Sequence, residues 1–280
     1  MALAEPYVRT PLPGWSHTEL LYETIDNGRI AIITMNRPER LNAMGPGMRW
    51  EEAWINFASD ENCWVAIVTG VGDRAFSAGA DLTRGRDEGG ATAGTGQPPA
   101  VRPLRRIVEP IGPYLGCWKP TIAAINGYAI GFGFATAQNC TFRIAAEHAE
   151  MGIAEARWNQ GGGFASWVPR LIGSGHALEI CIMADRRVSA QRAYEMGFVN
   201  KVVPKEQLMD EAVDWARTIC EMAPRAVRDL NELIHTCWNM SIPEAMAFGA
   251  ALTHNLQGME DSVEGRRAFA EKRKPVFKNR

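Results

Sequence analysis

Short, continuously apolar runs alternate with amphipathic segments along the first two thirds of the chain. Residues 30–36 (IAIITMN) and 64–70 (WVAIVTG) are rich in β-branched side chains and end in turn-forming residues, which is typical of strands buried on both faces. An apolar stripe at spacings of three and four residues lies between them: Trp50, Ala53, Trp54 and Phe57. The order strand, helix, strand predicts an α/β domain with parallel strands.

A third apolar run has the same character. Residues 121–125 (TIAAI) lead into Asn126-Gly127 and then into Gly131 and Gly133, followed by small residues. This pattern predicts a strand, a turn and a closely packed helix. The segment 84–106 is dominated by Gly, Thr, Pro and charged residues, so we expect a mobile surface loop, with a substrate lid as the alternative.

The pattern becomes helical after Pro204. Asp261-x-x-Glu264 resembles a capping box that opens a last helix. We therefore expect an α/β core over residues 1–204 and a helical region over residues 205–280. Two apolar stripes at helical spacing indicate its earlier helices: Leu208, Ala212, Trp215, Ala216 and Ile219, and then Phe248, Leu252 and Leu256.

Composition narrows the class of protein. Of the 280 residues, 46% are hydrophobic, enough for a sizeable core, and 30 basic against 32 acidic residues give a net charge of −2. That balance argues against a nucleic-acid partner. The six cysteines form no Cys-x-x-Cys pair, which favours reduced thiols over disulfides. No apolar stretch is long enough for a signal sequence or a membrane span, so we expect a cytoplasmic protein with no membrane partner.

The usual motifs of nucleophilic, metal and nucleotide chemistry are missing. The sequence has no Gly-x-Ser-x-Gly, no His-Glu-x-x-His and no phosphate-binding P-loop, and its five histidines stand apart. Gly131-x-Gly133 is not followed by the third glycine of a dinucleotide site, because that position is Thr136. We therefore expect neither a metal ion nor a nucleotide cofactor.

Two segments place small residues directly after predicted strands: 75–81 (AFSAGAD) and 126–134 (NGYAIGFGF). Tight turns of this kind expose backbone N–H groups. If the two turns converge, they form an oxyanion hole, a pair of donors for a carbonyl oxygen that becomes negative in the transition state. The alternative is that the small residues merely permit close packing of strand and helix.

Five ordered segments, spanning most of the chain, carry a family resemblance. The chain resembles the crotonase (enoyl-CoA hydratase/isomerase) superfamily. The segments are MNRPERLNAM (35–44), AFSAGADL (75–82), KPTIAAINGYAIG (119–131), VSAQRAYEMGFVNKVVP (188–204) and AFAEKRKPVFK (268–278). The resemblance implies a crotonase-like spiral of ββα units, a helical C-terminal trimerisation region, and a site that binds acyl-CoA thioesters and stabilises their enolates.

The resemblance also implies roles for individual residues. The oxyanion donors fall on the backbone N–H groups of Ala80 and Phe132, although family members usually have glycine where this chain has Phe132. Coenzyme A enters as part of the substrate, with no separate cofactor. The implied coenzyme A contacts are Arg40, Leu41, Ala78, Ala80, Asp81 and Leu82, together with Phe269 and Lys272 from a neighbouring subunit of a homotrimer or a dimer of trimers.

The C-terminal tail is compatible with this reading. Residues 266–280 contain seven basic side chains and a single acid, Glu271. Such a tail suits the phosphates of coenzyme A, and a solvated helix face is the alternative.

Hydratases of this family use two glutamates. Here the second falls on Glu155, but the first falls on Ala135, which can transfer no proton; a lost proton-transfer group typically removes ~10²–10⁴-fold of rate. A single base suffices to move a proton along an acyl chain. We therefore expect an isomerase or an atypical hydratase, with His148, Trp158 or Gln160 as substitutes for the missing group. The alternatives are a carbon–carbon bond hydrolase or dehydratase acting on a CoA ester, and a non-catalytic acyl-CoA-binding protein.

Overall fold

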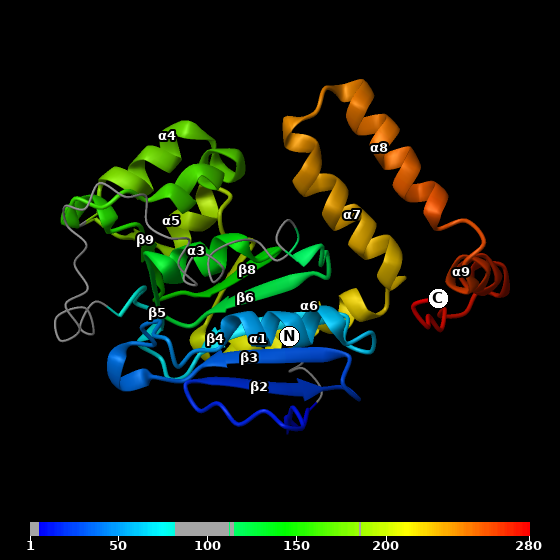
Figure 1. Ribbon diagram of the computed structural model, residues 1–280, viewed down its shortest axis with the longest axis horizontal. Coiled ribbons are helices and arrows are strands. Elements are labelled where there is room, and N and C mark those ends of the chain that lie inside the picture. The colour runs from blue at the N-terminus through cyan, green and yellow to red at the C-terminus, as the bar shows by residue number, and fades with distance from the viewer. Residues whose placement is uncertain (1–5, 82–111, 113–114, 185) are drawn as a thin grey trace.

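Strands alternate between two sheets along the central part of the chain (Figure 1). The computed structural model describes residues 6–81, 112, 115–184 and 186–280. The larger sheet has the order β1 (Thr10–Pro11), β2 (Leu20–Ile25), β3 (Ile30–Met35), β4 (Val65–Gly70), β6 (Thr121–Ile125), β8 (Phe142–Ala146) and β11 (Lys201–Val203). The smaller sheet has the order β10 (Val188–Ser189), β9 (Glu150–Gly152), β7 (Tyr128–Ile130) and β5 (Ala75–Ser77).

The two sheets are built by a repeating pair of strands. β4, β6 and β8 enter the larger sheet, and the strand that follows each of them, β5, β7 or β9, enters the smaller one. From β3 to β11 the larger sheet is parallel, and β5, β7 and β9 are also parallel to one another. The helix α3 (Phe132–Asn139) completes one such unit. The predicted spiral of ββα units is therefore confirmed.

Burial explains why the apolar runs become strands. Every residue of β3, β4 and β6 is buried, because both faces of the larger sheet are covered. The helix α1 (Trp50–Ser59) buries the four residues of its predicted stripe. Its last turn is held by the buried Lys119, whose Nζ donates to the carbonyl oxygens of Phe57 (2.6 Å) and Asp60 (2.7 Å).

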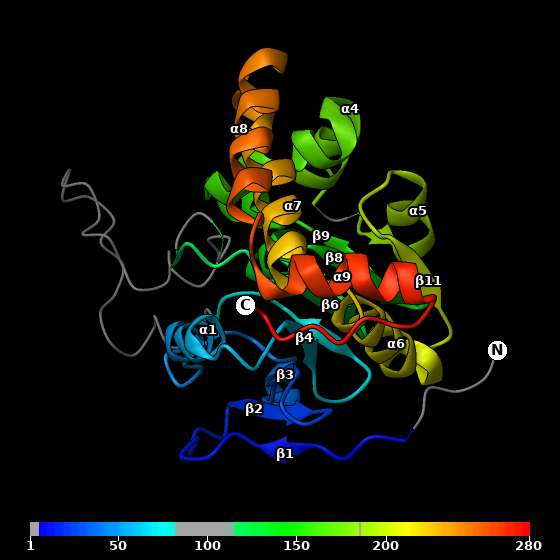
Figure 2. The same cartoon turned by 90° about the vertical axis from the view of Figure 1, so that its right-hand side faces the viewer.

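The helices of the C-terminal region differ in how they contact the sheets. α6 (Leu208–Cys220) packs on β4, β6 and β8 and shares their apolar core. α7 (Pro224–Thr236) and α8 (Ile242–Asn255) form a hairpin that projects from the sheets (Figures 1 and 2). α9 (Glu260–Glu271) ends the helical part of the chain. The division at residue 204 stays a prediction.

Shorter elements connect these layers, and several of them bear on the site. The remaining helices are η1 (Pro38–Arg40), η3 (Glu155–Trp158), η4 (Gly163–Trp167), α4 (Val168–Ile182), α5 (Ala190–Glu195), η5 (Lys205–Gln207) and η6 (Cys237–Asn239). Among the described residues, no helix is both long enough and apolar enough to cross a bilayer. The expected loop over 84–106 lies outside the described residues.

The predicted capping box at the last helix is wrong. α9 begins at Glu260, and the carboxylate of Asp261 accepts the backbone N–H groups of Lys278 (2.7 Å) and Asn279 (2.8 Å). The chain after α9 returns along the helix and occupies that carboxylate, which a local motif cannot reveal. A capping box does exist at α8, where Ser241 and Glu244 each accept the backbone N–H of the other.

Candidate active site

The two small-residue turns meet at the ends of adjacent parallel strands, β5 and β7. A Cβ placed on Gly79 would lie 2.8 Å from the carbonyl oxygen of Ile130 and 3.3 Å from the backbone nitrogen of Phe132. Gly79 has φ +96°, a conformation that favours glycine. Within the described chain, the backbone N–H groups of Ala80 and Phe132 donate to no other protein group. The structure thus brings the two expected donors into neighbouring turns.

Buried hydrogen bonds fix the first of these turns. The hydroxyl of Ser77 accepts the N–H of Gly79 (3.2 Å) and donates to the carbonyl of Asn42 (2.8 Å). The amide of Asn42 in turn donates to the carbonyl of Ala75 (2.8 Å). Sequence reasoning assigned no role to Ser77 or Asn42, although a polar residue beside an apolar strand was a usable signal. This network holds the Ala80 turn before any ligand arrives.

The second turn leads into the N-terminus of α3. Gly131 has φ +56° and ψ −117°, and Phe132 is the first residue of the helix. Phe132 has no positive φ, so the replacement of the family's usual glycine is compatible with the helix start. Its ring packs edge-to-face on Phe164, with centroids 5.7 Å apart and planes at 73°. The unpaired N–H of a helix start is a natural donor to a developing negative charge.

Glu155 lies against this second turn. It begins η3, and its Oε1 would be 2.9 Å from a Cβ placed on Gly131. Its Oε2 is buried and has no hydrogen-bond partner within the described chain. Burial raises the pKa of the Glu155 carboxyl above its ordinary value. A carboxylate of raised pKa, with one oxygen that has no hydrogen-bond partner within the described chain, can act as a general base beside two backbone donors.

The position of the missing glutamate is closed to solvent. Ala135 is fully buried in α3, one turn after Gly131, whose carbonyl accepts its N–H (2.9 Å). The proposed substitutes are engaged elsewhere or exposed: the ring of His148 contacts the carbonyl of Asp73 (2.9 Å), and Trp158 is 59% exposed. Within the described chain, neither they nor the side chain of Gln160 forms a hydrogen bond with the Glu155 carboxylate.

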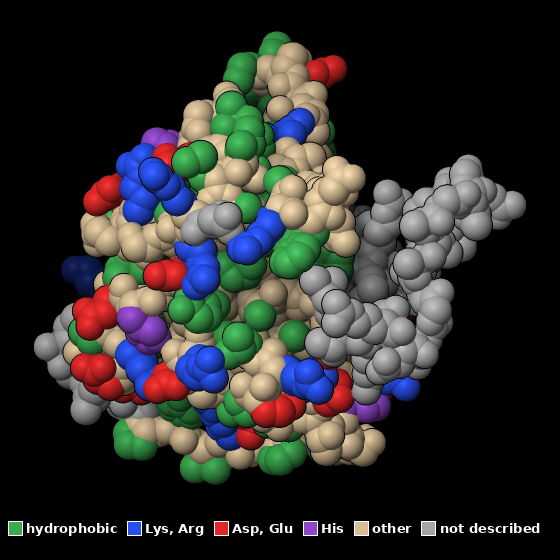
Figure 3. All heavy atoms as spheres, turned by 90° about the vertical axis from the view of Figure 1, so that its left-hand side faces the viewer, with side chains coloured by type: hydrophobic (Ala, Val, Ile, Leu, Met, Phe, Trp, Pro, Cys, Tyr) green, Lys and Arg blue, Asp and Glu red, His purple; other side chains and the backbone are tan. Residues whose placement is uncertain are grey.

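A pocket of about 330 Å³ contains two of the expected coenzyme A contacts. Leu41 and Ala78 line it together with Trp158, Arg157 and Arg187. Basic and apolar side chains are interspersed on this side of the molecule (Figure 3). Aromatic and guanidinium groups at one pocket are suited to a nucleotide with its phosphates.

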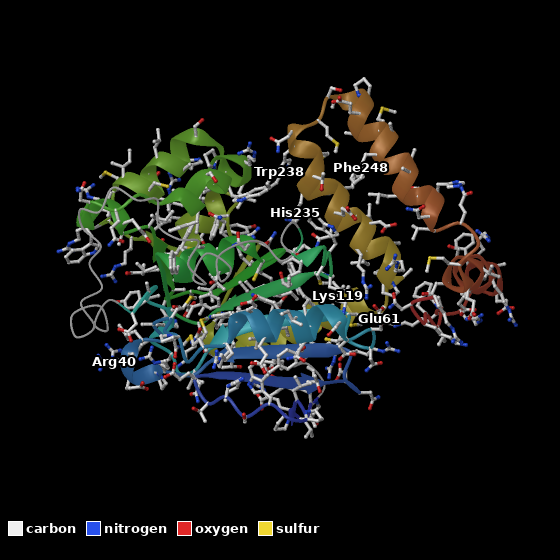
Figure 4. The ribbon with its side chains drawn as sticks, in the orientation of Figure 1. Arg40, Glu61, Lys119, His235, Trp238 and Phe248 are labelled. Atoms are coloured by element: carbon white, nitrogen blue, oxygen red, sulfur yellow. The ribbon has the colours of Figure 1, made fainter. Side chains whose placement is uncertain are left out.

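The other expected contacts in this region differ in accessibility. Arg40 is exposed at the end of η1 (Figure 4). The carboxylate of Asp81 is only 6% exposed and forms an ion pair with Arg37 (2.9 Å), so its side chain fixes the turn after Ala80. Leu82 lies outside the described residues.

The expected tail residues lie far from these groups within one chain. Phe269 is 87% exposed, and Lys272 ends α9 in the left-handed conformation. α9 and η1 lie at opposite ends of the long axis (Figures 1 and 4). Much of the tail's basic charge is paired internally: Arg273 with Glu264 and Glu271, Lys274 with Glu221, and Arg280 with Glu260. Among the described residues Lys272 forms no ion pair, and its role at a neighbouring subunit stays a prediction.

Comparisons with known proteins show the family to which the chain belongs. Residues 25–280 match the family described as enoyl-CoA hydratase/isomerase. The carnitinyl-CoA dehydratase of Escherichia coli (strain K12) is 36% identical over 263 residues, which cover 91% of this chain and 97% of that protein.

Solved structures share the fold along almost the whole chain. The enoyl-CoA hydratase of Bacillus anthracis has a TM-score of 0.81 and 31% identity, covering 94% of this chain and all of that one. An enoyl-CoA hydratase/isomerase of Mycobacterium paratuberculosis has a TM-score of 0.84 and 31% identity, covering 95% of this chain and all of that one. The chain therefore belongs to the enoyl-CoA hydratase/isomerase family of enzymes, which act on coenzyme A esters.

Proposed function

We propose that the protein is a one-glutamate acyl-CoA isomerase or atypical hydratase of cytoplasmic metabolism. The observation that carries this proposal is the half-buried Glu155 carboxylate beside Gly131, whose Oε2 has no hydrogen-bond partner within the described chain, next to the two free backbone donors of Ala80 and Phe132. A thioester oxygen placed between the donors would put the α-carbon of the acyl group within reach of a base on the same side.

The chemistry needs only these groups. Glu155 removes a proton from the γ-carbon of an enoyl thioester, and the electron pair moves through the conjugated system onto the thioester oxygen. The N–H groups of Ala80 and Phe132 stabilise the resulting dienolate. The protonated Glu155 then returns the same proton to the α-carbon, so that the double bond moves and no other reactant is consumed.

Ala135 favours isomerisation over hydration. Adding water requires one group to activate the water and another to protonate the α-carbon, and a buried alanine methyl does neither. The similarity to a carnitinyl-CoA dehydratase supports a second candidate, elimination of water from a 3-hydroxyacyl-CoA. In that reaction Glu155 would remove the α-proton and pass it to the hydroxide that leaves the β-carbon, so that water departs and the base is regenerated.

Substrate binding is proposed to use more than one subunit. Arg40, Leu41 and Ala78 would contact coenzyme A from one chain, and Phe269 and Lys272 would contact it from the neighbour in a homotrimer or a dimer of trimers. This division is supported by the distance between α9 and η1 within a chain (Figure 1). No nucleic-acid or membrane partner is proposed.

Replacing the base tests the proposal. Wild-type protein and Glu155→Gln are assayed with 2-enoyl-, 3-enoyl- and 3-hydroxyacyl-CoA esters, with product analysis to separate isomerisation from hydration. We expect kcat to fall by ~10²–10⁴-fold while KM changes little, because the amide keeps the shape but accepts no proton. Glu195→Gln, an exposed carboxylate on α5, serves as the control and should retain activity.

Two outcomes would contradict the proposal. If Glu155→Gln is as active as the wild type, the general-base role is wrong. If calorimetry shows tight binding of acyl-CoA esters by the wild type but no ester is turned over, the chain is an acyl-CoA-binding protein.

A further inference from the structure

Three consecutive glycines, Gly161 to Gly163, lead from the Glu155 helix η3 into the next helix, η4, which begins at Gly163. A Cβ on Gly161 or Gly163 would meet no atom within 4 Å, and one on Gly162 would make only ordinary contacts, the nearest 3.5 Å from Ile153. None of the three has a positive φ. Packing therefore does not require glycine at these three positions. Glycine instead leaves the backbone between η3 and η4, the glycine joint, free to bend. The position of η4 must be set by contacts outside the joint.

On one side, η4 contacts the start of the candidate site. The ring of Phe164 packs edge-to-face on Phe132, one of the two proposed oxyanion donors. The carbonyl oxygen of Phe164 accepts a hydrogen bond from Nε2 of Gln138 on α3 (3.0 Å). A movement of η4 would therefore disturb the residue that donates to the thioester oxygen.

One turn further along the same side, η4 contacts the C-terminal helices. Trp167 is three residues after Phe164 in a 3₁₀ helix, and residues at that spacing lie one above the other. Its ring centroid is 5.5 Å from that of Trp238 in η6. Beside this contact, Nη2 of Arg170 donates to Oδ1 of Asn239 (3.1 Å), and the same guanidinium lies over the Trp167 ring.

Trp238 is itself held in place by α7. Its ring lies 5.7 Å from that of His235, whose Nδ1 contacts the carbonyl of Asn231 (2.8 Å). Asn231 also donates to the carbonyl of Trp118, just before β6 (2.9 Å). Figure 4 shows His235 and Trp238 toward the end of α7 that lies nearest to α4. The contacts form a continuous path from α7 through η6 and η4 to Phe132.

We propose that Trp238 is a positioning residue, which holds η4 through Trp167. It thereby fixes the Phe132 turn and, through the glycine joint, limits the access of water to Glu155. This inference rests on the proposed function of Phe132 and Glu155. It assigns a role in the catalytic geometry to a helix that is remote from both in sequence and contacts neither directly.

The joint at the start of η4 lies close to Glu155 along the chain. The glycine joint folds back on Ile153, and the backbone N–H of Gln160 donates to the carbonyl of Glu155 (3.0 Å). The pKa of the Cys181 thiol on α4 is raised, first by burial and then by the charge of Glu155. Arg157 is the basic group on η3 itself. If η4 loosens, water reaches Glu155 and the burial that raises its pKa is reduced.

Trp238→Ala tests the proposal in the full-length protein, with the acyl-CoA ester that the wild type turns over best. We expect kcat to fall by about tenfold, because small misplacements of reacting groups are costly, while KM stays within about twofold since the coenzyme A contacts are elsewhere. The acid limb of the plot of kcat/KM against pH should move to lower pH, because a less buried Glu155 has a less raised pKa. Trp238→Phe keeps an aromatic contact, so its kcat should stay within about threefold of the wild-type value.

Controls separate positioning from general loss of stability. Trp215→Ala removes a half-buried tryptophan from α6, where it packs on Phe142 away from η4, and it should change neither kcat nor the acid limb. Asn239→Ala removes only the hydrogen bond to Arg170. It should lower kcat and shift the acid limb as Trp238→Ala does, but more weakly. This variant provides the test if Trp238→Ala does not fold. Wild-type kcat and an unchanged acid limb in Trp238→Ala, or an equal loss in Trp238→Phe, would overturn the inference. An active Glu155→Gln would instead overturn the proposed function.

Discussion

Gly131 is the residue on which the candidate site depends most directly. It has φ +56°, and any Cβ there would lie 2.9 Å from Oε1 of Glu155. The backbone conformation therefore disfavours a side chain, and any Cβ would displace the neighbouring carboxylate. The proposed general base is thus placed beside a backbone position that requires glycine.

The variant Gly131→Ala is expected to lose activity and stability together. The backbone conformation alone (φ +56°, ψ −117°) costs roughly 1–3 kcal/mol for a residue with a Cβ, and the methyl group would displace the carboxylate. We expect at least a tenfold fall in kcat/KM and a lower Tm. Gly152→Ala is the matched control, because a Cβ on Gly152 meets nothing within 4 Å and its φ is not positive; equal behaviour of the two variants would contradict the argument.

Burial of Glu155 also predicts how stability depends on pH. Because the folded-state pKa is raised, the folded protein favours the protonated carboxyl, and that contribution to stability is present below the ordinary glutamate pKa and lost as the pH rises through the raised one. At neutral pH the ionised Glu155 therefore destabilises the fold. We expect Glu155→Gln to raise the Tm at pH 7 by roughly 1–3 °C, with the difference vanishing in acid. A lower Tm at pH 7 would show that the carboxylate is stabilised by a partner.

Elements with a strong periodic signal were predictable, whereas contacts between distant segments were not. β3, β4, β6 and α1 follow the predicted runs within a residue or two, because complete burial or a regular stripe is written locally in the sequence. The capping box predicted at Asp261 is absent, because its carboxylate instead accepts backbone N–H groups of the C-terminal tail, a segment that the local motif does not include.

The candidate site was predictable only as far as the family resemblance reached. Ala80, Phe132 and Glu155 were expected, and the structure places them together. Their roles stay predictions. Trp238 could not be found in the same way, because no pattern along the chain relates residue 238 to residue 167; only the packing of η6 on η4 reveals the pair.

At the scale of the whole molecule, the α7–α8 hairpin buries little of its surface against the rest of the chain. α8 has no buried residue, and α7 buries only Pro224. Large apolar side chains are exposed along both helices: Leu230 (61%), Ile234 (57%), Ile242 (75%) and Met246 (71%). Exposed apolar groups gathered on one hairpin are typical of a subunit interface.

We therefore expect sedimentation to show a trimer or a hexamer, and the double variant Leu230→Glu, Met246→Glu to shift it toward the monomer. Because Phe269 and Lys272 are proposed to act on a neighbour's ligand, acyl-CoA affinity measured by calorimetry should fall in the same variant. A wild-type monomer, or a monomeric variant of unchanged affinity, would contradict this view. An exposed acidic substitution on α5, Gln191→Glu, serves as the control for added charge.

The glycine joint between η3 and η4 has a consequence for how such a chain can diversify. Since the glycines leave the joint free to bend, substitutions in η6 or α7 that shift η4 would reshape the region around Phe164 and, with it, the Phe132 turn. New acyl groups would then be accommodated through inherited changes far from the reacting atoms. Rate and selectivity would change together, without a substitution at any reacting residue.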